Sequence, residues 1–290
     1  MKIEAYAKVN FTLEVFGKRV DGYHALRSVV MPISLADTLE IDEDLELSSD
    51  TGYPDDLILK AAKTLRAAVP PDGRVRGARI RVTKRIPVGG GLGGGSADAA
   101  AALVALNDLW ALGLSRDELA MLGAQVGSDV PALVLGGPVI MEGRGEKVTP
   151  LNPNPQTPEH PNSIPSFHLV LANPGVFSST KEVYARCKAR LPDDGAILYN
   201  MRKALESGDC EAVAAAMMND LQAPAVELHP EIAEALAALE AAGATGVTMS
   251  GSGSTVFGLV PSEARGREIA ALLNAKGLKA WSVQTHCPVV

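Results

Sequence analysis

A run of glycines stands where an expected strand gives way to an expected helix. Residues 89–95 hold six glycines in seven positions, and a segment rich in alanine and leucine begins after Ser96. Glycine permits close backbone approach and positive φ. A helix N-terminus presents free N–H groups and a partial positive charge. Together these features favour a bound anion, most often a phosphate.

Neither of the two commonest nucleotide loops matches this run well. The pattern GxxxxGK[ST] requires a lysine after the glycines, and none is present. A GxGxxG string passes through Gly89, Gly91 and Gly94. A dinucleotide site also needs a parallel βαβ unit, whereas the segment after Gly113 has a helical pattern. A tight strand–helix corner needs only one or two glycines, so we favour a phosphate loop of another kind.

Two charged residues elsewhere could take part in chemistry. Asp129 lies in "GSDVP", which we expect to be a short loop because Pro131 disfavours helix at the residue before it. An aspartate there either caps the loop or accepts a proton from a hydroxyl. Residues 7–15 alternate as a half-buried strand, with Lys8 and Asn10 on its polar face. A lysine on such a face is usually solvated, so the residues alone leave both roles open.

The composition limits the classes of protein to which the chain can belong. Its 290 residues are 47% hydrophobic and 21% charged, which suits two domains with a sizeable core. The net charge of -7 argues against a nucleic-acid or membrane partner. The three cysteines form no CxxC pair, and the N-terminus lacks the apolar core of a signal peptide. We therefore expect a soluble, cytoplasmic protein.

The periodicity predicts mixed α+β structure in both halves of the chain. Alternating or continuous apolar patterns predict strands at 7–15, 37–47, 78–86, 167–174, 246–250, 254–260 and 278–284. Helical patterns occur at 55–69, 96–110, 115–127, 180–190, 210–220, 230–242 and 262–275. Residues 151–165 contain five prolines and mark the best boundary. We expect lobes at 1–152 and 153–290.

Three stretches together resemble the GHMP kinases. "PVGGGLGGGSADAA" resembles the second motif of that family, "AYAKVNFTLEV" its first and "TMSGSGSTVFGLV" its third. The three occur in the family's order and cover most of the chain. The resemblance implies a ribosomal-protein-S5-like N-terminal lobe, a ferredoxin-like C-terminal lobe and an active site between them. It also implies ATP and Mg²⁺ as cofactors, although the five histidines show no metal-ligand spacing and we assign no metal ligand.

The resemblance also implies roles for individual residues. Asp129 would accept the proton of the substrate hydroxyl, and Lys8 would keep that carboxylate charged and offset charge on the transferred phosphoryl group. The residues that would bind ATP are Pro87, Val88, Gly89, Gly90, Gly91, Leu92, Gly93, Gly94, Gly95, Ser96 and Ala97. Two positions depart from the pattern of many relatives: Ala97 stands where a second serine is common, and Asp56 where several have asparagine. Both departures concern contacts with the nucleotide.

A narrower resemblance concerns the substrate. The stretch "AKVNFTLEVFGKRVDGYHALRSVVMPISLAD", with "GSDVPALVLGG" and "NPGVFSSTKEVY", resembles the branch that phosphorylates the 2-hydroxyl of a cytidine diphosphate-linked methylerythritol in the non-mevalonate isoprenoid pathway. This branch implies that Tyr23 and Phe177 stack on cytosine, that His24 bonds to the base edge, and that Asn10 and Thr180 contact the substrate.

Three other functions stay open at this point. The chain could be a homoserine or mevalonate type of kinase, but "DGYH" favours a cytidine-bearing substrate. It could be an ATP-dependent decarboxylase of the same fold, which CO₂ release would reveal. It could also be a nucleotide-binding regulator, although the pair of Lys8 and Asp129 argues against that.

Overall fold

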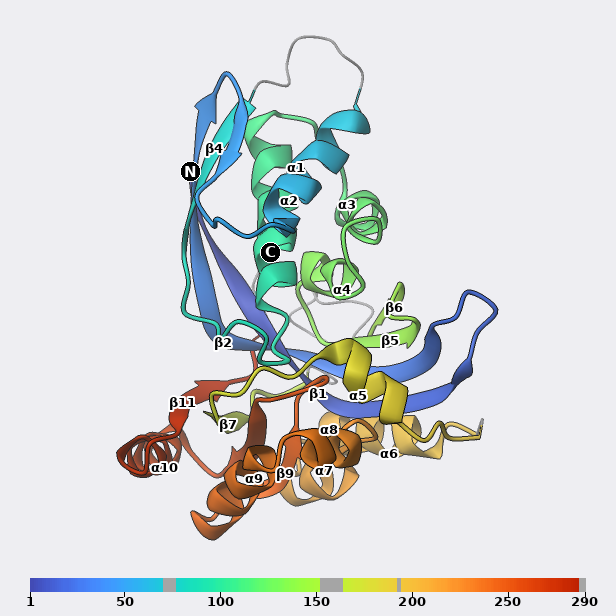
Figure 1. Ribbon diagram of the computed structural model, residues 1–290, viewed down its shortest axis with the longest axis vertical. Coiled ribbons are helices and arrows are strands. Elements are labelled where there is room, and N and C mark those ends of the chain that lie inside the picture. Colours follow the sequence, from blue (N-terminus) through green and yellow to red (C-terminus); the bar gives the residue numbers. More distant parts are fainter. Residues whose placement is uncertain (70–76, 152–163, 192–193, 287–290) are drawn as a thin grey trace.

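Two sheets organise the chain, one in each lobe. The computed structural model describes residues 1–69, 77–151, 164–191 and 194–286 (Figure 1). The N-terminal sheet has seven strands in the order β3-β4-β2-β1-β8, with β5 paired to β2 and β6 to β5. Its strands are β1 (Lys2–Lys18), β2 (His24–Asp44), β3 (Leu47–Ser49), β4 (Gly77–Thr83), β5 (Val139–Gly143), β6 (Lys147–Pro150) and β8 (Met218–Asn219). The predicted α+β structure with two lobes is confirmed.

The long antiparallel pair β1 and β2 forms the middle of this sheet. On β1 the apolar residues Val9 and Phe11 are fully buried, as their alternation predicts. The polar residues between them are buried too: Lys8 and Asn10 are each only 4% exposed. The strand is therefore not half-buried as predicted, because the glycine run and residues of the second lobe cover its polar face.

Four helices lie on one side of the N-terminal sheet (Figure 1). They are α1 (Leu57–Ala67), α2 (Gly94–Leu109), α3 (Arg116–Gly123) and α4 (Val130–Leu135). Ser115 and Glu118 form the predicted capping box at the start of α3. The expected loop around Pro131 is wrong beyond Asp129, because α4 begins at Val130 with this proline in its first turn. Proline is tolerated there since a first-turn N–H needs no helical partner.

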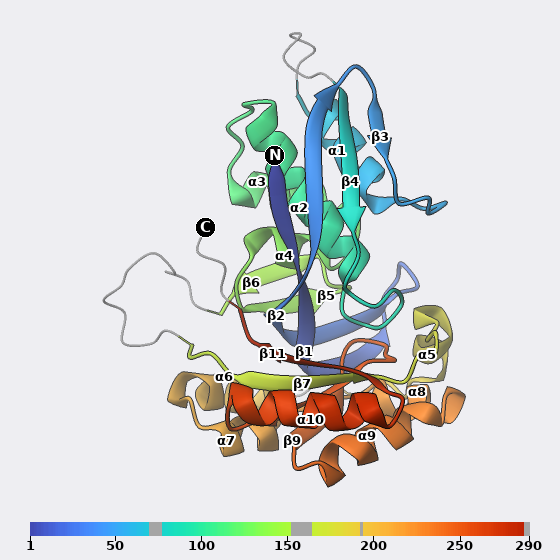
Figure 2. The same cartoon turned by 90° about the vertical axis from the view of Figure 1, so that its left-hand side faces the viewer.

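The C-terminal sheet is antiparallel in the order β11-β7-β10-β9. Its strands are β7 (His168–Asn173), β9 (Thr245–Met249), β10 (Val256–Val260) and β11 (Lys279–Gln284). The helices are α5 (Thr180–Arg186), α6 (Ala196–Ser207), α7 (Cys210–Ala216), α8 (Gln222–Leu228), α9 (Glu231–Ala241) and α10 (Glu263–Ala275). The sequence patterns did not predict α6 or α8. Helix α10 packs along β7 and β11 (Figure 2).

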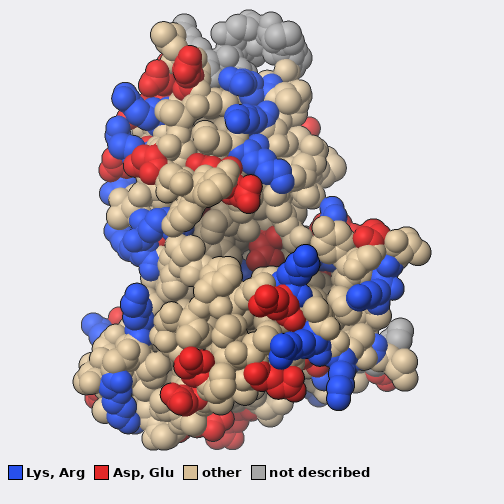
Figure 3. Space-filling model, in the orientation of Figure 1, with Lys and Arg blue, Asp and Glu red and all other residues tan. Residues whose placement is uncertain are grey.

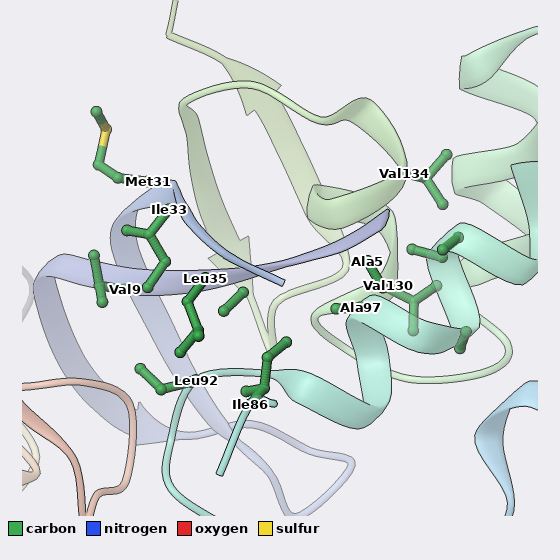
Figure 4. Close-up of a cluster of buried hydrophobic side chains, with 14 of the residues drawn as sticks. Ala5, Val9, Met31, Ile33, Leu35, Ile86, Leu92, Ala97, Val130 and Val134 are labelled. Carbon is green, nitrogen blue, oxygen red and sulfur yellow. The ribbon is translucent and has the colours of Figure 1, made fainter. Parts of the chain in front are cut away.

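Alternation along β7 joins the two lobes into one structure. Leu169 and Leu171 belong to the same core as Phe11 of β1, whereas Val170 and Ala172 pack in a second core with α9 and α10. Ile86, shortly before the glycine run, and Leu92, in the middle of it, lie in the larger core (Figure 4). The glycine run is thus anchored by buried side chains before it and within it. The predicted boundary between residues 152 and 153 stays a prediction and lies outside the described residues.

Candidate functional site

A cavity of about 590 Å³ lies where the two lobes meet. Its walls come from the polar face of β1, the glycine loop (residues 87–95), helix α5 with the residues just before it, and residues 251–253 of the third-motif loop (residues 250–255). Residues 51–58, before and at the start of α1, form one further wall. The space-filling view has a hollow at mid-height on this face (Figure 3). The cavity collects most of the residues that the sequence singled out.

Lys8 lies at the centre of the cavity wall. Its ammonium donates to Asn10 Oδ1 at 2.8 Å and to the carbonyl of Gly91 at 3.2 Å. Asn10 in turn donates to Ser28 Oγ at 2.8 Å. Because residues two apart on a strand share a face, β1 presents Lys8 and Asn10 side by side. The buried ammonium is therefore held in one place by groups from β1 and from the glycine loop.

Asp129 faces Lys8 across the glycine loop. It precedes the first residue of α4, and its Oδ2 lies 3.4 Å from Lys8 Nζ. Its side chain keeps 32% of its surface exposed, whereas that of Lys8 keeps 5%. A Cβ on Gly93 would lie 3.2 Å from Lys8 Cε and 3.5 Å from Asp129 Oδ2. A carboxylate, an ammonium and bare backbone thus converge on one part of the cavity.

The glycine loop leads directly into α2. Gly93, the residue before the helix, has φ +70° and provides no capping side chain. No side chain therefore caps the first-turn N–H groups, the arrangement that binds an anion. Ser96 lines the cavity but does not cap the helix, which begins at Gly94.

The predicted ATP residues do not all face the cavity. Pro87, Val88, the six glycines, Leu92 and Ser96 line it. The side chain of Leu92 is nevertheless buried in the core, and Ala97 is only 2% exposed and packs in the same core. A second serine hydroxyl at position 97 would thus enter the core rather than the cavity.

Several glycines of the loop approach protein rather than open space. A Cβ on Gly91 would lie 2.1 Å from the carbonyl oxygen of Ser250, and one on Gly89 would lie 2.6 Å from the ring of Phe177. The third-motif loop bonds back to the glycine loop, because Ser250 Oγ donates to Gly91 O at 3.0 Å. Gly251 and Gly253 also line the cavity. The third motif therefore holds the glycine loop in place, besides joining two strands.

The predicted substrate residues separate into two groups. Thr180 and Phe177 line the cavity, whereas Tyr23 does not line it and is 59% exposed. The ring of Tyr23 lies under the guanidinium of Arg144, with 5.7 Å between its centroid and Cζ. Phe177 is 71% exposed and packs on Gly89. The ring contacts of the described residues do not pair Tyr23 with Phe177.

The structure places a different ring beside His24. Tyr184 on α5 lines the cavity, and its ring centroid lies 5.8 Å from that of His24. His24 Nδ1 lies 3.1 Å from the carbonyl oxygen of Phe16, which fixes the orientation of the imidazole. Burial and the nearby carboxylate of Asp129 raise the pKa of Tyr184, so its hydroxyl stays protonated. Sequence reasoning missed this tyrosine.

Asp56 caps α1 at the far wall of the cavity. Its Oδ1 accepts the N–H groups of Ile58 and Leu59, and its Oδ2 accepts the hydroxyl of Thr51 at 2.7 Å. Burial raises the pKa of this carboxyl, but hydrogen bonds led by those from Thr51 and Ser49 outweigh burial and leave the pKa below its ordinary value. The carboxylate of Asp56, which can only accept hydrogen bonds, thus stands where several relatives have asparagine.

The described residues contain no cluster of three or more histidines, cysteines or carboxylates that could hold a metal ion. None of the helices in the described part of the chain has the length and apolar character that a bilayer-spanning helix needs.

Family models match both lobes. The model of the GHMP kinases N terminal domain matches residues 56–137, and that of the GHMP kinases C terminal matches residues 201–279. A crystal structure of a mevalonate kinase has a TM-score of 0.67 and 18% identity over 98% of this chain and 99% of that chain. At that identity the likeness concerns the fold alone.

More similar proteins carry one common name. A 4-diphosphocytidyl-2-C-methyl-D-erythritol kinase of Symbiobacterium thermophilum is 43% identical over 98% of this chain and 99% of its own length. One of Pelotomaculum thermopropionicum is 43% identical over 92% of this chain and 91% of its own. A crystal structure of 4-(cytidine 5'-diphospho)-2C-methyl-D-erythritol kinase has a TM-score of 0.82 and 35% identity over 99% of this chain and 100% of that chain. The chain therefore belongs to the GHMP kinases and, within them, to the 4-diphosphocytidyl-2-C-methyl-D-erythritol kinases.

Proposed function

We propose that this enzyme transfers the γ-phosphoryl group of ATP to the 2-hydroxyl of 4-diphosphocytidyl-2-C-methyl-D-erythritol, in the non-mevalonate route to isopentenyl diphosphate. The observation that carries the proposal is the pairing of Lys8 with Asp129, 3.4 Å apart, against a glycine loop and a helix N-terminus in one cavity. A phosphate site and a candidate base thus lie next to each other. The identity of the substrate is inferred from the relatives named above.

The reaction needs in-line placement of a hydroxyl against a phosphoryl group and neutralisation of charge. The N–H groups at the start of α2 and the glycine loop would bind the phosphates of ATP. Asp129 would accept the proton of the 2-hydroxyl as the oxygen attacks phosphorus. Lys8, fixed by Asn10 and the carbonyl of Gly91, would keep Asp129 ionised and offset charge on the transferred group.

The cytidine end of the substrate would lie near His24 and Tyr184. An aromatic ring provides a stacking surface for a base, and Tyr184 lines the same cavity as Asp129. His24 would then bond to the edge of the base, as the sequence resemblance implies. Tyr23, on the exposed turn next to His24, would cover the other face of the base. In this arrangement Tyr184 replaces Phe177 as the ring opposite Tyr23.

Mg²⁺ would arrive as the complex with ATP, since phosphate oxygens are its usual partners in kinases. The ion would neutralise charge on the phosphates. The residues described above would orient the nucleotide and the hydroxyl, and we assign none of them as a metal ligand. Ala97 and Asp56, where the sequence departs from the pattern of relatives, leave Lys8 and Asp129 unchanged.

The decisive experiment measures ADP formation from MgATP with a panel of acceptors. We expect turnover with 4-diphosphocytidyl-2-C-methyl-D-erythritol and none with mevalonate, homoserine or galactose. Asp129→Asn should lower kcat by about 10²–10⁴-fold, the usual contribution of a general base, while the KM for ATP changes little. Asp117→Asn, an exposed aspartate on α3, is the matched control and should leave kcat unchanged.

Other outcomes would point elsewhere. Turnover only with mevalonate or homoserine would reject the substrate but keep the kinase. Release of CO₂ from an acid acceptor would indicate the decarboxylase. ATP binding without turnover on any acceptor would favour the regulator.

A further inference from the structure

A buried group of charges lies beneath the start of α2, and the mechanism above does not use it. We call it the acid–lysine cluster: Lys84, just after β4, with Asp37 of β2 and Asp98 of α2. Lys84 Nζ donates to Asp37 Oδ2 and, at 2.6 Å, to Asp98 Oδ2. The side chain of Asp37 is fully buried, and that of Asp98 is 5% exposed. Three separate elements thus place two carboxylates on one ammonium.

The two carboxylates differ in how well they are satisfied. Asp37 Oδ1 also accepts the backbone N–H groups of Arg85 and Ile86, so both of its oxygens have hydrogen-bond partners. Asp98 Oδ1 is buried and has no hydrogen-bond partner. One ammonium cannot balance two charged carboxylates, and the oxygen without a partner lies on Asp98. If either carboxyl group holds a proton, it is therefore Asp98.

The titration behaviour agrees with this geometry. Burial is the main cause that raises the pKa of Asp98 to about 7, with Lys84 opposing it and Asp37 adding to it. Burial lowers the pKa of Lys84, but its bonds to Asp37 and Asp98 outweigh that effect and leave it raised, so the amine stays charged.

The acid–lysine cluster also borders the nucleotide cavity. Lys84 and Asp98 both line it, and the Lys84 side chain keeps 24% of its surface exposed. A Cβ on Gly94, the first residue of α2, would lie 3.6 Å from Lys84 Nζ. The charge of the cluster is thus next to the backbone that would receive the phosphates.

We propose that Asp98 is a positioning residue for the nucleotide: it helps to hold Lys84 beneath the start of α2 and takes up a proton from solvent when MgATP binds. The inference rests on the proposed nucleotide site. Protonation at Oδ1 leaves Oδ2 as the acceptor for Lys84 and removes one negative charge. The neutral cluster then no longer repels the phosphates, and Lys84 remains oriented.

The direction of the pH effect follows from linkage. Below about pH 7 Asp98 already holds its proton before the nucleotide binds, so affinity does not depend on this group. Above that pH the proton must first be gained, so affinity falls as pH rises. Charged groups on the elements around α2 include Lys8 of β1, Asp37 of β2, Asp56 and Lys60 by α1, Arg116 of α3 and Asp129 before α4. Of these, only Asp37 affects the pKa of Asp98, together with Lys84.

Isothermal titration calorimetry tests the inference, with MgATP and no acceptor alcohol. Titrations at pH 7 in two buffers of different ionisation enthalpy count the protons exchanged on binding. The wild-type enzyme should take up about half a proton, since a group with a pKa near 7 is half protonated there. Asp98→Asn, which imitates the protonated carboxyl, should take up none. Asp108→Asn, an exposed aspartate on the same helix, should behave as the wild type.

The pH profile supplies a second readout. Between pH 6.5 and 8.5 the Kd of the wild type should rise on the order of tenfold more than that of Asp98→Asn. Equal profiles, with no proton uptake by the wild type, would overturn the inference while leaving the nucleotide site intact. Proton release on binding would also overturn it, because Asp98 would then act as an ionised ligand of the cation. A wild-type protein that binds no MgATP would reject the proposed function and this inference together.

Discussion

Replacing Gly91 by alanine tests whether the glycine loop exists to let two parts of the protein approach each other. Gly91 has φ +77°, and a Cβ at this position would lie 2.1 Å from the carbonyl oxygen of Ser250. It would also lie 2.9 Å and 3.1 Å from backbone atoms of Gly253. All three obstacles are main-chain atoms, which cannot rotate away. The alanine must therefore push the third-motif loop and the glycine loop apart.

Two terms set the size of the effect. A non-glycine residue in the left-handed region costs about 1–2 kcal/mol. Forcing extra atoms into a packed site costs about 1–3 kcal/mol more. Gly91→Ala should therefore lower the free energy of unfolding by about 2–5 kcal/mol, a large share of the 5–15 kcal/mol of an ordinary domain. A shift of the glycine loop also affects Lys8, because the Lys8 ammonium donates a hydrogen bond to the carbonyl oxygen of Gly91.

Gly113→Ala separates the two terms. Gly113 has φ +69°, but a Cβ there would meet nothing within 4 Å. Gly113→Ala therefore carries the cost of an alanine at positive φ but no steric clash. Replacing glycine by alanine also reduces the flexibility of the unfolded chain equally in both variants, so this effect cancels in the comparison. The difference between the two variants in urea unfolding isolates the steric term, about 1–3 kcal/mol. If Gly91→Ala unfolds at the same urea concentration as Gly113→Ala, the close approach of the two loops is refuted.

Two further predictions concern the substrate and the core. Tyr184→Ala should raise the KM for the cytidine substrate by about 5–150-fold, which corresponds to the loss of about 1–3 kcal/mol of base stacking, whereas Tyr184→Phe should leave this KM unchanged. Steady-state kinetics with both substrates measure the effect, and an equal rise in the KM for ATP would contradict the prediction. Glu14 is fully buried and accepts two hydrogen bonds from Arg27, at 2.7 Å and 2.8 Å. Arg27→Met should destabilise the protein by about 3–5 kcal/mol in urea unfolding, and adding Glu14→Gln should restore part of that loss; equal stability of the single and double variants would contradict the buried-charge explanation.

Local patterns predicted most elements because they record which face of an element is buried. The alternation of β1 and the capping box at Ser115 are properties of a few adjacent residues. They could not tell that the polar face of β1 is covered, since the covering atoms come from the glycine loop and from the other lobe. Lys8 and Asn10 look the same in sequence whether they face water or a cavity.

Helix α4 shows a limit of a rule applied to one residue. Proline disfavours helical backbone at the residue before it, which predicts a loop at Val130. The same proline fits the first turn of a helix, where its missing N–H costs nothing. The six residues of "VPALVL" bury Val130, Ala132 and Val134, and this burial outweighs the local preference. Because α4 begins at Val130, Asp129 is the residue before its first turn, and its side chain faces Lys8.

The proposed role of Tyr184 depends on the direction of a helix. The family resemblance implied that Phe177 stacks on cytosine, whereas Tyr184 had no predicted role. Thr180 begins α5, and Tyr184 follows it by four residues. Residues four apart lie on the same face of a helix, so a cavity contact at Thr180 predicts one at Tyr184. That signal was present in the sequence, but it depends on knowing that the helix starts at Thr180 and that its first residue faces the cavity. Phe177 lies before the helix, where it lines the same cavity and packs on Gly89.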